Sequence, residues 1–381
     1  MGKFILWQIK RWLVPALVIL GVMTMSMVIL GASESLTYTL YNDPYGGTFS
    51  YNDGSSTFFM GAMLYSSLVS IVFPMFVFNY KFGIRRADFY KQLPFAENQL
   101  RRTILLSGLV IALVGVSLAF LTGTGILLIR HFAFDKSTLI STPDYTQYLY
   151  TFKYRYLLVF YLLLMLNVFA TYSISCLFVY HNVTVFEAII GVLLAQLCLG
   201  LLPYAIASQV STIKGWVTND FVEPTYVTFS TISPVIGAVN INSLFYGMEE
   251  EIWKNLYWNI GVYLISGLGS FIWMFMVKDR SADIENEKGN PSIITLIALH
   301  GGFLGVMLFA NSLASYTIYL GLIINIFVIA SYFFINVLFG HGFKLRMQQW
   351  IPLLVISLIV IADLVILAVT RSANVENYPY Y

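Results

Sequence analysis

The fold is decided first by the stretch WLVPALVILGVMTMSMVILG, which runs from Trp12 to Gly31 without a charged residue. About 20 helical residues suffice to cross the hydrocarbon core of a bilayer, so this stretch predicts a membrane span. Lys3, Lys10 and Arg11 precede it, as in a signal peptide. A cleavable signal has only about 7 to 15 apolar residues, however. We therefore expect a retained first span with the N-terminus inside.

Further apolar runs follow along the rest of the chain, and each is long enough to span. They cover residues 58–80, 104–129, 156–180, 184–206, 256–277, 292–313, 316–339 and 350–370. Only 10% of the residues are charged, whereas about 25% is usual in a soluble domain. The sequence therefore predicts an all-α fold, a polytopic transmembrane bundle of about nine spans without a soluble catalytic domain.

The distribution of Lys and Arg predicts how the bundle is oriented. With the N-terminus inside, 14 of the 21 basic residues fall in inner segments, and the richest of these lies between the second and third spans. Basic residues collect on the cytoplasmic side of membrane proteins. We therefore expect the C-terminus outside. A net charge of +2 gives no indication of a nucleic-acid partner.

Polar stretches between the runs predict how the chain is divided. The longest polar stretch on the inside follows residue 277, so we expect a six-span section at 1–277 and a cytoplasmic connector with a three-span section at 278–381. Outside, turn-forming residues at 42–47 and 52–54 flank alternating segments, which is typical of a hairpin. A small outer β-hairpin is therefore predicted between the first two spans.

The familiar signatures of enzyme chemistry are absent from the sequence. It has no Gly-rich phosphate loop, no His-Glu-x-x-His, no metal-binding Cys/His spacing and no Gly-x-Ser-x-Gly elbow. Cys176 and Cys198 both fall within apolar runs, which favours small buried hydrophobic residues over a disulfide or metal pair. We therefore expect no catalytic, cofactor or metal residues on this chain, and any ATP hydrolysis on a separate subunit.

Two ionisable residues within predicted spans are candidates for a functional role, because a charge in lipid is costly. Asp363 lies well inside the last run, between apolar neighbours on both sides, and His300 lies in the seventh. A substrate or proton path is one interpretation of Asp363. The alternatives are a structural carboxyl that bonds to a neighbouring helix and, for His300, a hydrogen-bonded packing residue.

The inner segment at 81–102 carries the most specific pattern. Pro94 is suited to the first turn of a helix, where its missing N–H costs nothing. The helix that follows places Phe95 and Leu100 toward one surface, with Glu97 and Arg101 projecting elsewhere. Such an amphipathic helix suits docking into a groove of a partner protein. It equally suits a basic helix that rests on anionic headgroups.

This segment resembles the cytoplasmic loop of ABC-2 type transporter permeases, especially the Ytr-like permeases of Gram-positive bacteria. The matching residues are Arg85, Asp88, Phe89, Tyr90, Leu93, Pro94 and Leu100. Arg280 and Glu285, after the sixth span, and Phe343-Lys344, before the last, also resemble elements of that family. Ala96 and Glu97 depart from its pattern, and a changed charge at a docking surface can select a different partner.

The resemblance implies a multi-pass protein of the bacterial cytoplasmic membrane. It also implies a homo- or heterodimeric membrane core bound to two cytoplasmic ABC ATPase subunits. The contact residues it implies are Leu93, Pro94, Phe95, Glu97, Leu100 and Arg101, with Arg280 and Glu285 as a weaker second contact. The apolar bundle with aromatic outer loops favours a peptide, an antibiotic or a lipid-like solute as substrate, and the resemblance implies that the solute moves outward. Two other functions stay open: a membrane-embedded enzyme acting on lipid-linked substrates, and a non-transporting sensor or immunity subunit.

Overall fold

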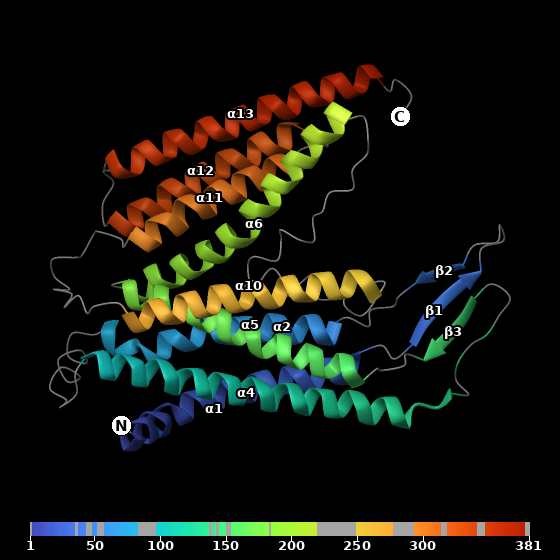
Figure 1. Ribbon diagram of the computed structural model, residues 1–381, viewed down its shortest axis with the longest axis vertical. Coiled ribbons are helices and arrows are strands. Elements are labelled where there is room, and N and C mark those ends of the chain that lie inside the picture. Colours follow the sequence, from blue (N-terminus) through green and yellow to red (C-terminus); the bar gives the residue numbers. More distant parts are fainter. Residues whose placement is uncertain are drawn as a thin grey trace.

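The computed structural model describes most of the chain as helices (Figure 1). The described residues are 2–34, 37–42, 48–51, 57–82, 97–136, 139, 141, 145–149, 154–182, 184–218, 249–276, 293–313, 318–340 and 347–377. Their α-helices are α1 (Gly2–Ser33), α2 (Thr57–Val77), α4 (Glu97–Ala133), α5 (Tyr154–His181), α6 (Val185–Thr218), α10 (Glu249–Met276), α11 (Ile293–Leu313), α12 (Ile318–Gly340) and α13 (Met347–Asn377). Each of the nine predicted apolar runs coincides with one of them.

Seven of these helices are long and apolar enough to cross a bilayer, namely α1, α2, α4, α5, α6, α10 and α11. The other two carry shorter apolar segments, at Ile323–Ile335 and Trp350–Ile366. Pro74 and Pro203 lie inside α2 and α6, and both helices continue past them. These features support a multi-pass membrane protein, as the composition predicted.

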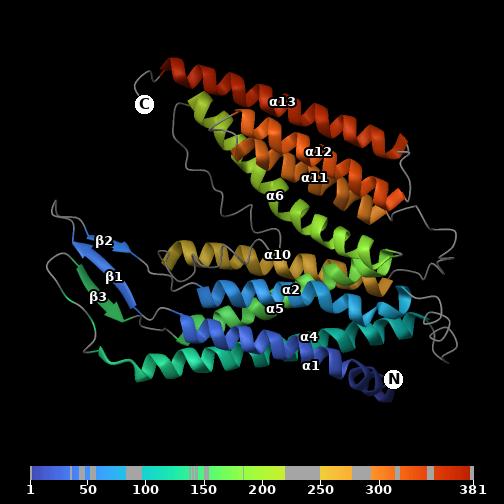
Figure 2. The ribbon, with the colours of Figure 1, turned by 180° about the vertical axis from the view of Figure 1, so that it is seen from behind.

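The helices pack as two groups (Figures 1 and 2). One group comprises α1, α2, α4, α5 and α10, and the other comprises α6, α11, α12 and α13. Helix α6 packs most extensively against α11 and also contacts α5, so it joins the groups. The predicted boundary at 277/278 falls outside the described residues. In the packing, α6 lies with the three C-terminal helices although it precedes α10 in sequence.

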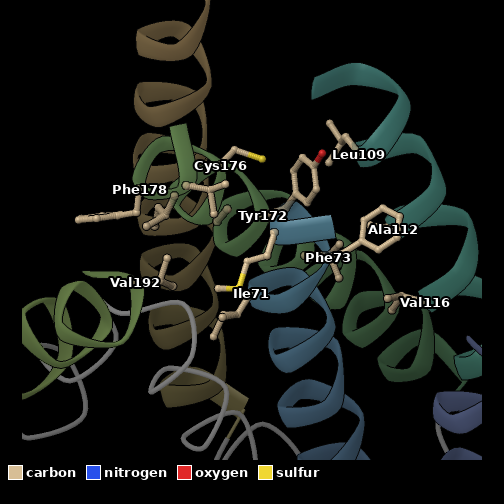
Figure 3. Close-up of a cluster of buried hydrophobic side chains, with 14 of the residues drawn as sticks. Ile71, Phe73, Leu109, Ala112, Val116, Tyr172, Cys176, Phe178 and Val192 are labelled. Atoms are coloured by element: carbon tan, nitrogen blue, oxygen red, sulfur yellow. The ribbon is translucent and has the colours of Figure 1, made fainter. Parts of the chain in front are cut away.

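Apolar side chains cover the helices on their exposed as well as their buried sides. Val18, Val22, Met25 and Ile29 form an exposed stripe along α1, at helical spacing. Between the helices, labelled side chains from α2, α4, α5 and α6 gather into one cluster, in which the Tyr172 ring points toward α4 beside Leu109 (Figure 3). A helix that is apolar all round is typical of a membrane span.

Glycines bring α1 and α4 unusually close together. A Cβ built on Gly31 would lie 2.6 Å from the backbone oxygen of Gly123, and one on Gly123 would lie 2.8 Å from the Met27 oxygen. Small residues allow such backbone approaches between membrane helices, where dispersion contacts replace the hydrophobic effect as the driving force. The two helices are therefore held together by backbone contact at this position.

Hydrogen bonds between buried polar side chains join α2 to α5. Asn167 Nδ2 donates to Ser67 Oγ at 2.8 Å, and Asn167 Oδ1 accepts from Thr171 Oγ1 at 3.2 Å. The neighbouring hydroxyls of Ser70 and Ser175 donate to carbonyl oxygens of their own helices. Because these donors have acceptors within the bundle, they can be buried without the cost of an unpaired polar group.

A three-stranded antiparallel sheet lies at one end of the first helix group (Figure 1). Its order is β2 (Thr48–Tyr51), β1 (Thr37–Asn42), β3 (Tyr145–Leu149). Strand β1 pairs with β2 from Thr39↔Tyr51 to Asn42↔Thr48, which confirms the predicted hairpin. Strand β3 comes from the connection between α4 and α5 and was not predicted. We call this end of the bundle the sheet end, and the opposite end, where α4 begins, the basic end.

A buried carboxyl group takes part in the hydrogen bonds that join the helix ends next to the sheet. Glu34, directly after α1, is 2% exposed, and its Oε2 accepts a 2.7 Å hydrogen bond from the backbone N–H of Phe58 in the first turn of α2. Arg130, in the last turn of α4, donates through Nη1 to the carbonyl oxygens of Gly31 and Glu34, at 2.9 and 3.0 Å. The junction therefore joins the three helix ends from which the strands extend.

The electrostatics of this junction favour the protonated form of Glu34. Burial raises the pKa of its carboxyl to about 7, against the lowering effects of the Phe58 hydrogen bond and the Arg130 charge. Its second oxygen, Oε1, is buried without a hydrogen-bond partner. A carboxyl group in this position changes charge near neutral pH.

Candidate functional site at the basic end

The predicted coupling segment lies only partly within the described residues. Leu93, Pro94, Phe95, Arg280 and Glu285 fall outside them. Glu97 is the first residue of α4. Leu100 and Arg101, which the resemblance places in the contact with an ATPase, are both buried among helices of this chain. The described part of the coupling segment is thus the beginning of α4, the longest of the described helices.

Arg101 is the largest buried polar side chain at this end, with 1% of its surface exposed. Its Nη1 donates to the phenol oxygen of Tyr180 on α5 at 2.9 Å, and its Nη2 donates to Asn98 Oδ1 at 2.7 Å. The guanidinium carbon also lies 5.1 Å from the centroid of the Tyr180 ring. Guanidinium groups bind both to phenol oxygens and over aromatic faces. Arg101 therefore ties the start of α4 to the end of α5.

Two further cations surround the same helix ends. The ammonium of Lys81, in the short helix η1 (Asn79–Phe82), lies 4.3 Å from the centroid of the Tyr180 ring. Arg102 is exposed, and its Nη2 donates to the Phe275 carbonyl oxygen at 3.3 Å, near the end of α10. Side chains from η1, α5 and α10 thus lie together near the beginning of α4. We call Lys81, Arg101, Arg102, Tyr180 and Phe275 the basic-end cluster.

Only part of this cluster was indicated by the sequence. Arg101 was assigned to a docking contact, and Tyr180 and Phe275 were not singled out. A Tyr at the end of an apolar run is ordinary in a membrane protein, because aromatic rings concentrate at the interface. What distinguishes Tyr180 is its hydrogen bond to a buried Arg from another helix, which sequence spacing does not encode.

The intramembrane candidates lie in the second helix group. Asp363 Oδ2 accepts a 2.7 Å hydrogen bond from Asn311 Nδ2, and Asn311 Oδ1 accepts one of 2.6 Å from Asn325 Nδ2. His300 is half-buried, with Nδ1 2.6 Å from the Leu296 carbonyl oxygen and its ring 5.8 Å from that of Tyr332. Asp363 is therefore bonded to a neighbouring helix, and His300 lies among packing contacts. A role of Asp363 or His300 in transport stays a prediction.

Within the described residues, no three His, Cys, Asp or Glu side chains are grouped so that they could hold a metal ion. Both cysteines are free; Cys176 is buried and Cys198 is partly exposed. No family model, curated protein or solved structure matches the chain.

Proposed function

We propose that this chain is the membrane-spanning permease subunit of an ATP-driven ABC transporter, with ATP hydrolysed on a separate cytoplasmic subunit. The observation that carries the proposal is the position of Arg101. The segment that resembles an ATPase-binding loop leads directly into α4, and Arg101 ties that end of α4 to α5. A second permease subunit, and outward movement of a peptide, an antibiotic or a lipid-like solute, belong to the same proposal.

In this proposal the basic-end cluster transmits force. Closure of the ATPase displaces the segment before α4, and a helix of 37 residues moves as one body. The Arg101 bonds carry the displacement to α5, and the Arg102 bond carries it to α10. Because Leu100 and Arg101 are buried, we propose that Leu93 to Phe95 form the docking surface. Leu100 and Arg101 would then link that surface to the bundle.

The docking step is tested by affinity purification of the tagged chain from its native membrane, with ATPase activity measured in the eluate. Phe95→Asp is expected to abolish the co-purified activity while the chain itself is still inserted. Phe132→Asp is the matched control, because Phe132 is exposed on α4 at the sheet end. It introduces the same charge far from the docking segment and should leave the activity unchanged. Equal activity in both variants, or none with the unaltered chain, would contradict the proposal.

The transmission step needs a different variant. Tyr180→Phe keeps the aromatic ring and removes the hydroxyl that Arg101 binds. We expect this variant to retain the bound ATPase, since Tyr180 lies on α5 and not in the docking segment, but to lose a large part of ATP-driven substrate movement in proteoliposomes. A variant that loses ATPase binding together with transport would instead place Tyr180 in the docking contact.

A further inference from the structure

Three polar side chains meet in the second helix group, and each comes from a different helix. Asn311 of α11, Asn325 of α12 and Asp363 of α13 are 0%, 5% and 9% exposed. Met307 and Leu308 precede Asn311 by about one turn of α11, and Val360 precedes Asp363 by about one turn of α13. These three residues belong to a buried apolar cluster that also contains Ala205 and Ile356. A carboxylate and two amides are expensive to place among such side chains, so their meeting requires a reason beyond packing.

The hydrogen bonds of this trio run in one direction. Asn325 donates to Asn311, and Asn311 donates to Asp363 and, at 3.3 Å, to the Val360 carbonyl oxygen. Asn311 therefore presents its N–H groups to the carboxylate and to a backbone carbonyl, and Asn325 presents its N–H group to the oxygen of Asn311. As a consequence, the remaining amide oxygen, Asn325 Oδ1, is buried without a hydrogen-bond partner. An unsatisfied buried acceptor costs about 1 to 3 kcal/mol.

We infer that Asp363, Asn325 and Asn311 form a binding site for a single Na⁺ ion between α11, α12 and α13. Carboxylate and amide oxygens are the ligands that hard cations prefer, and one carboxylate matches one positive charge. The unpartnered oxygen distinguishes Na⁺ from a proton, because an amide oxygen coordinates a metal ion readily but is not protonated near neutral pH. A divalent ion usually gathers several carboxylates, and Asp363 is the single carboxylate of this trio.

Ion binding here would add a further link between three helices that already meet through apolar contacts and hydrogen bonds. The ion supplies the positive partner that Asn325 Oδ1 lacks, and it neutralises the carboxylate within the apolar group. The folded, ion-bound protein should accordingly be stabilised by Na⁺ in a saturable way. The inference concerns only the second helix group, so it does not depend on the proposed ATPase partner.

The experiment measures thermal unfolding of the purified full chain in detergent. NaCl is compared with KCl and with choline chloride at constant ionic strength and pH. We expect a saturable rise in Tm that Na⁺ alone produces. Asp363→Asn should abolish it, and Asn325→Leu, which leaves the Asn311–Asp363 bond in place, should weaken the apparent Na⁺ affinity by at least about tenfold. Binding of radioactive sodium to the same samples gives a readout that does not depend on unfolding.

The control variant is Asn259→Leu. Asn259 on α10 is also buried with an unpartnered Oδ1, but it lies in the other helix group. This variant should keep the full response to Na⁺. Equal Tm values in the three salts, or a Na⁺ response that survives both Asp363→Asn and Asn325→Leu, would overturn the site. A response to pH that requires Asp363 but not Na⁺ would assign the trio to a proton and overturn the Na⁺ assignment.

Discussion

Helix α4 carries a buried or half-buried arginine near each end, and the two are held in opposite ways. Arg130 lies in the last turn, where the partial negative charge of the helix end favours a cation, and it donates to backbone carbonyls of α1 and Glu34. Arg101 lies near the beginning of α4, where the helix field gives no such help, and it binds the side chains of Tyr180 and Asn98. The comparison teaches that the contacts of Arg101 depend on particular side chains, whereas those of Arg130 depend on backbone geometry.

The largest expected effect comes from breaking the side-chain contacts of the basic end. Arg101→Leu should lower the free energy of unfolding by about 3 kcal/mol, because the buried Tyr180 hydroxyl and Asn98 lose a charged donor. Arg101→Lys should restore little of it, since an ammonium cannot reproduce the two-pronged geometry. Arg130→Lys should cost less, because a single ammonium can still donate to carbonyl oxygens. Thermal or denaturant unfolding in detergent measures all three.

A double-mutant cycle sharpens this test. In Arg101→Leu with Tyr180→Phe, both partners of the 2.9 Å bond are replaced by apolar groups. The double variant should be more stable than the sum of the single losses predicts, by about 1 to 2 kcal/mol. Additive losses would mean that the two residues stabilise the bundle independently, and the proposed link between α4 and α5 would have no energetic support.

The second prediction concerns backbone geometry near the sheet end. Gly31→Ala would place a Cβ 2.6 Å from the Gly123 oxygen, so α1 and α4 must move apart. We expect a loss of about 2 kcal/mol. Gly21→Ala, on the same helix, is the matched control: nothing lies within 4 Å of its Cβ, and alanine is favoured over glycine in helices. That variant should be neutral or slightly stabilising. Equal unfolding temperatures for the two would refute the close contact.

The sequence predicts the helices and the hairpin, but not the third strand. The length of the apolar runs and their lack of charge located every described α-helix, because a span must be both apolar and about 20 residues long. Turn chemistry located the β1–β2 hairpin. Strand β3 was missed, since its partner β1 lies about 100 residues earlier and a single short strand has no local signal.

The same limit applies to the candidate sites. Asp363 is conspicuous in sequence as a charge in an apolar run, but Asn311 and Asn325 become partners only through the packing of three helices. Arg101 resembles an exposed residue because it lies in a strongly basic segment, and the structure buries it against Tyr180. A local sequence pattern identifies a charged residue that is unfavourable to bury. Which side chain forms hydrogen bonds with that residue depends on tertiary packing.

The smallest expected effect is a pH dependence of stability that arises from Glu34 at the sheet end. Burial raises the pKa of Glu34 to about 7 in the folded protein, from the ordinary 4.5. The folded state therefore binds this proton more tightly than the unfolded state does. The contribution of the Glu34 proton to the stability of the folded protein is complete below pH 4.5. It is lost as the pH rises from 4.5 through 7. Glu34→Gln should remove that decline and be more stable than the unaltered chain above pH 7, by about 1 to 2 kcal/mol.

The pH series separates this junction from the other titrating groups. Glutamine has the shape of the neutral carboxyl and still accepts from the Phe58 N–H, so the two proteins should differ little at pH 5 and diverge toward pH 8. Contributions from other groups are common to both and cancel in the difference. A constant difference across the range would mean that Glu34 acts only as a cap of α2. A difference that grows on acidification would mean that the Arg130 charge outweighs burial and keeps the carboxylate ionised.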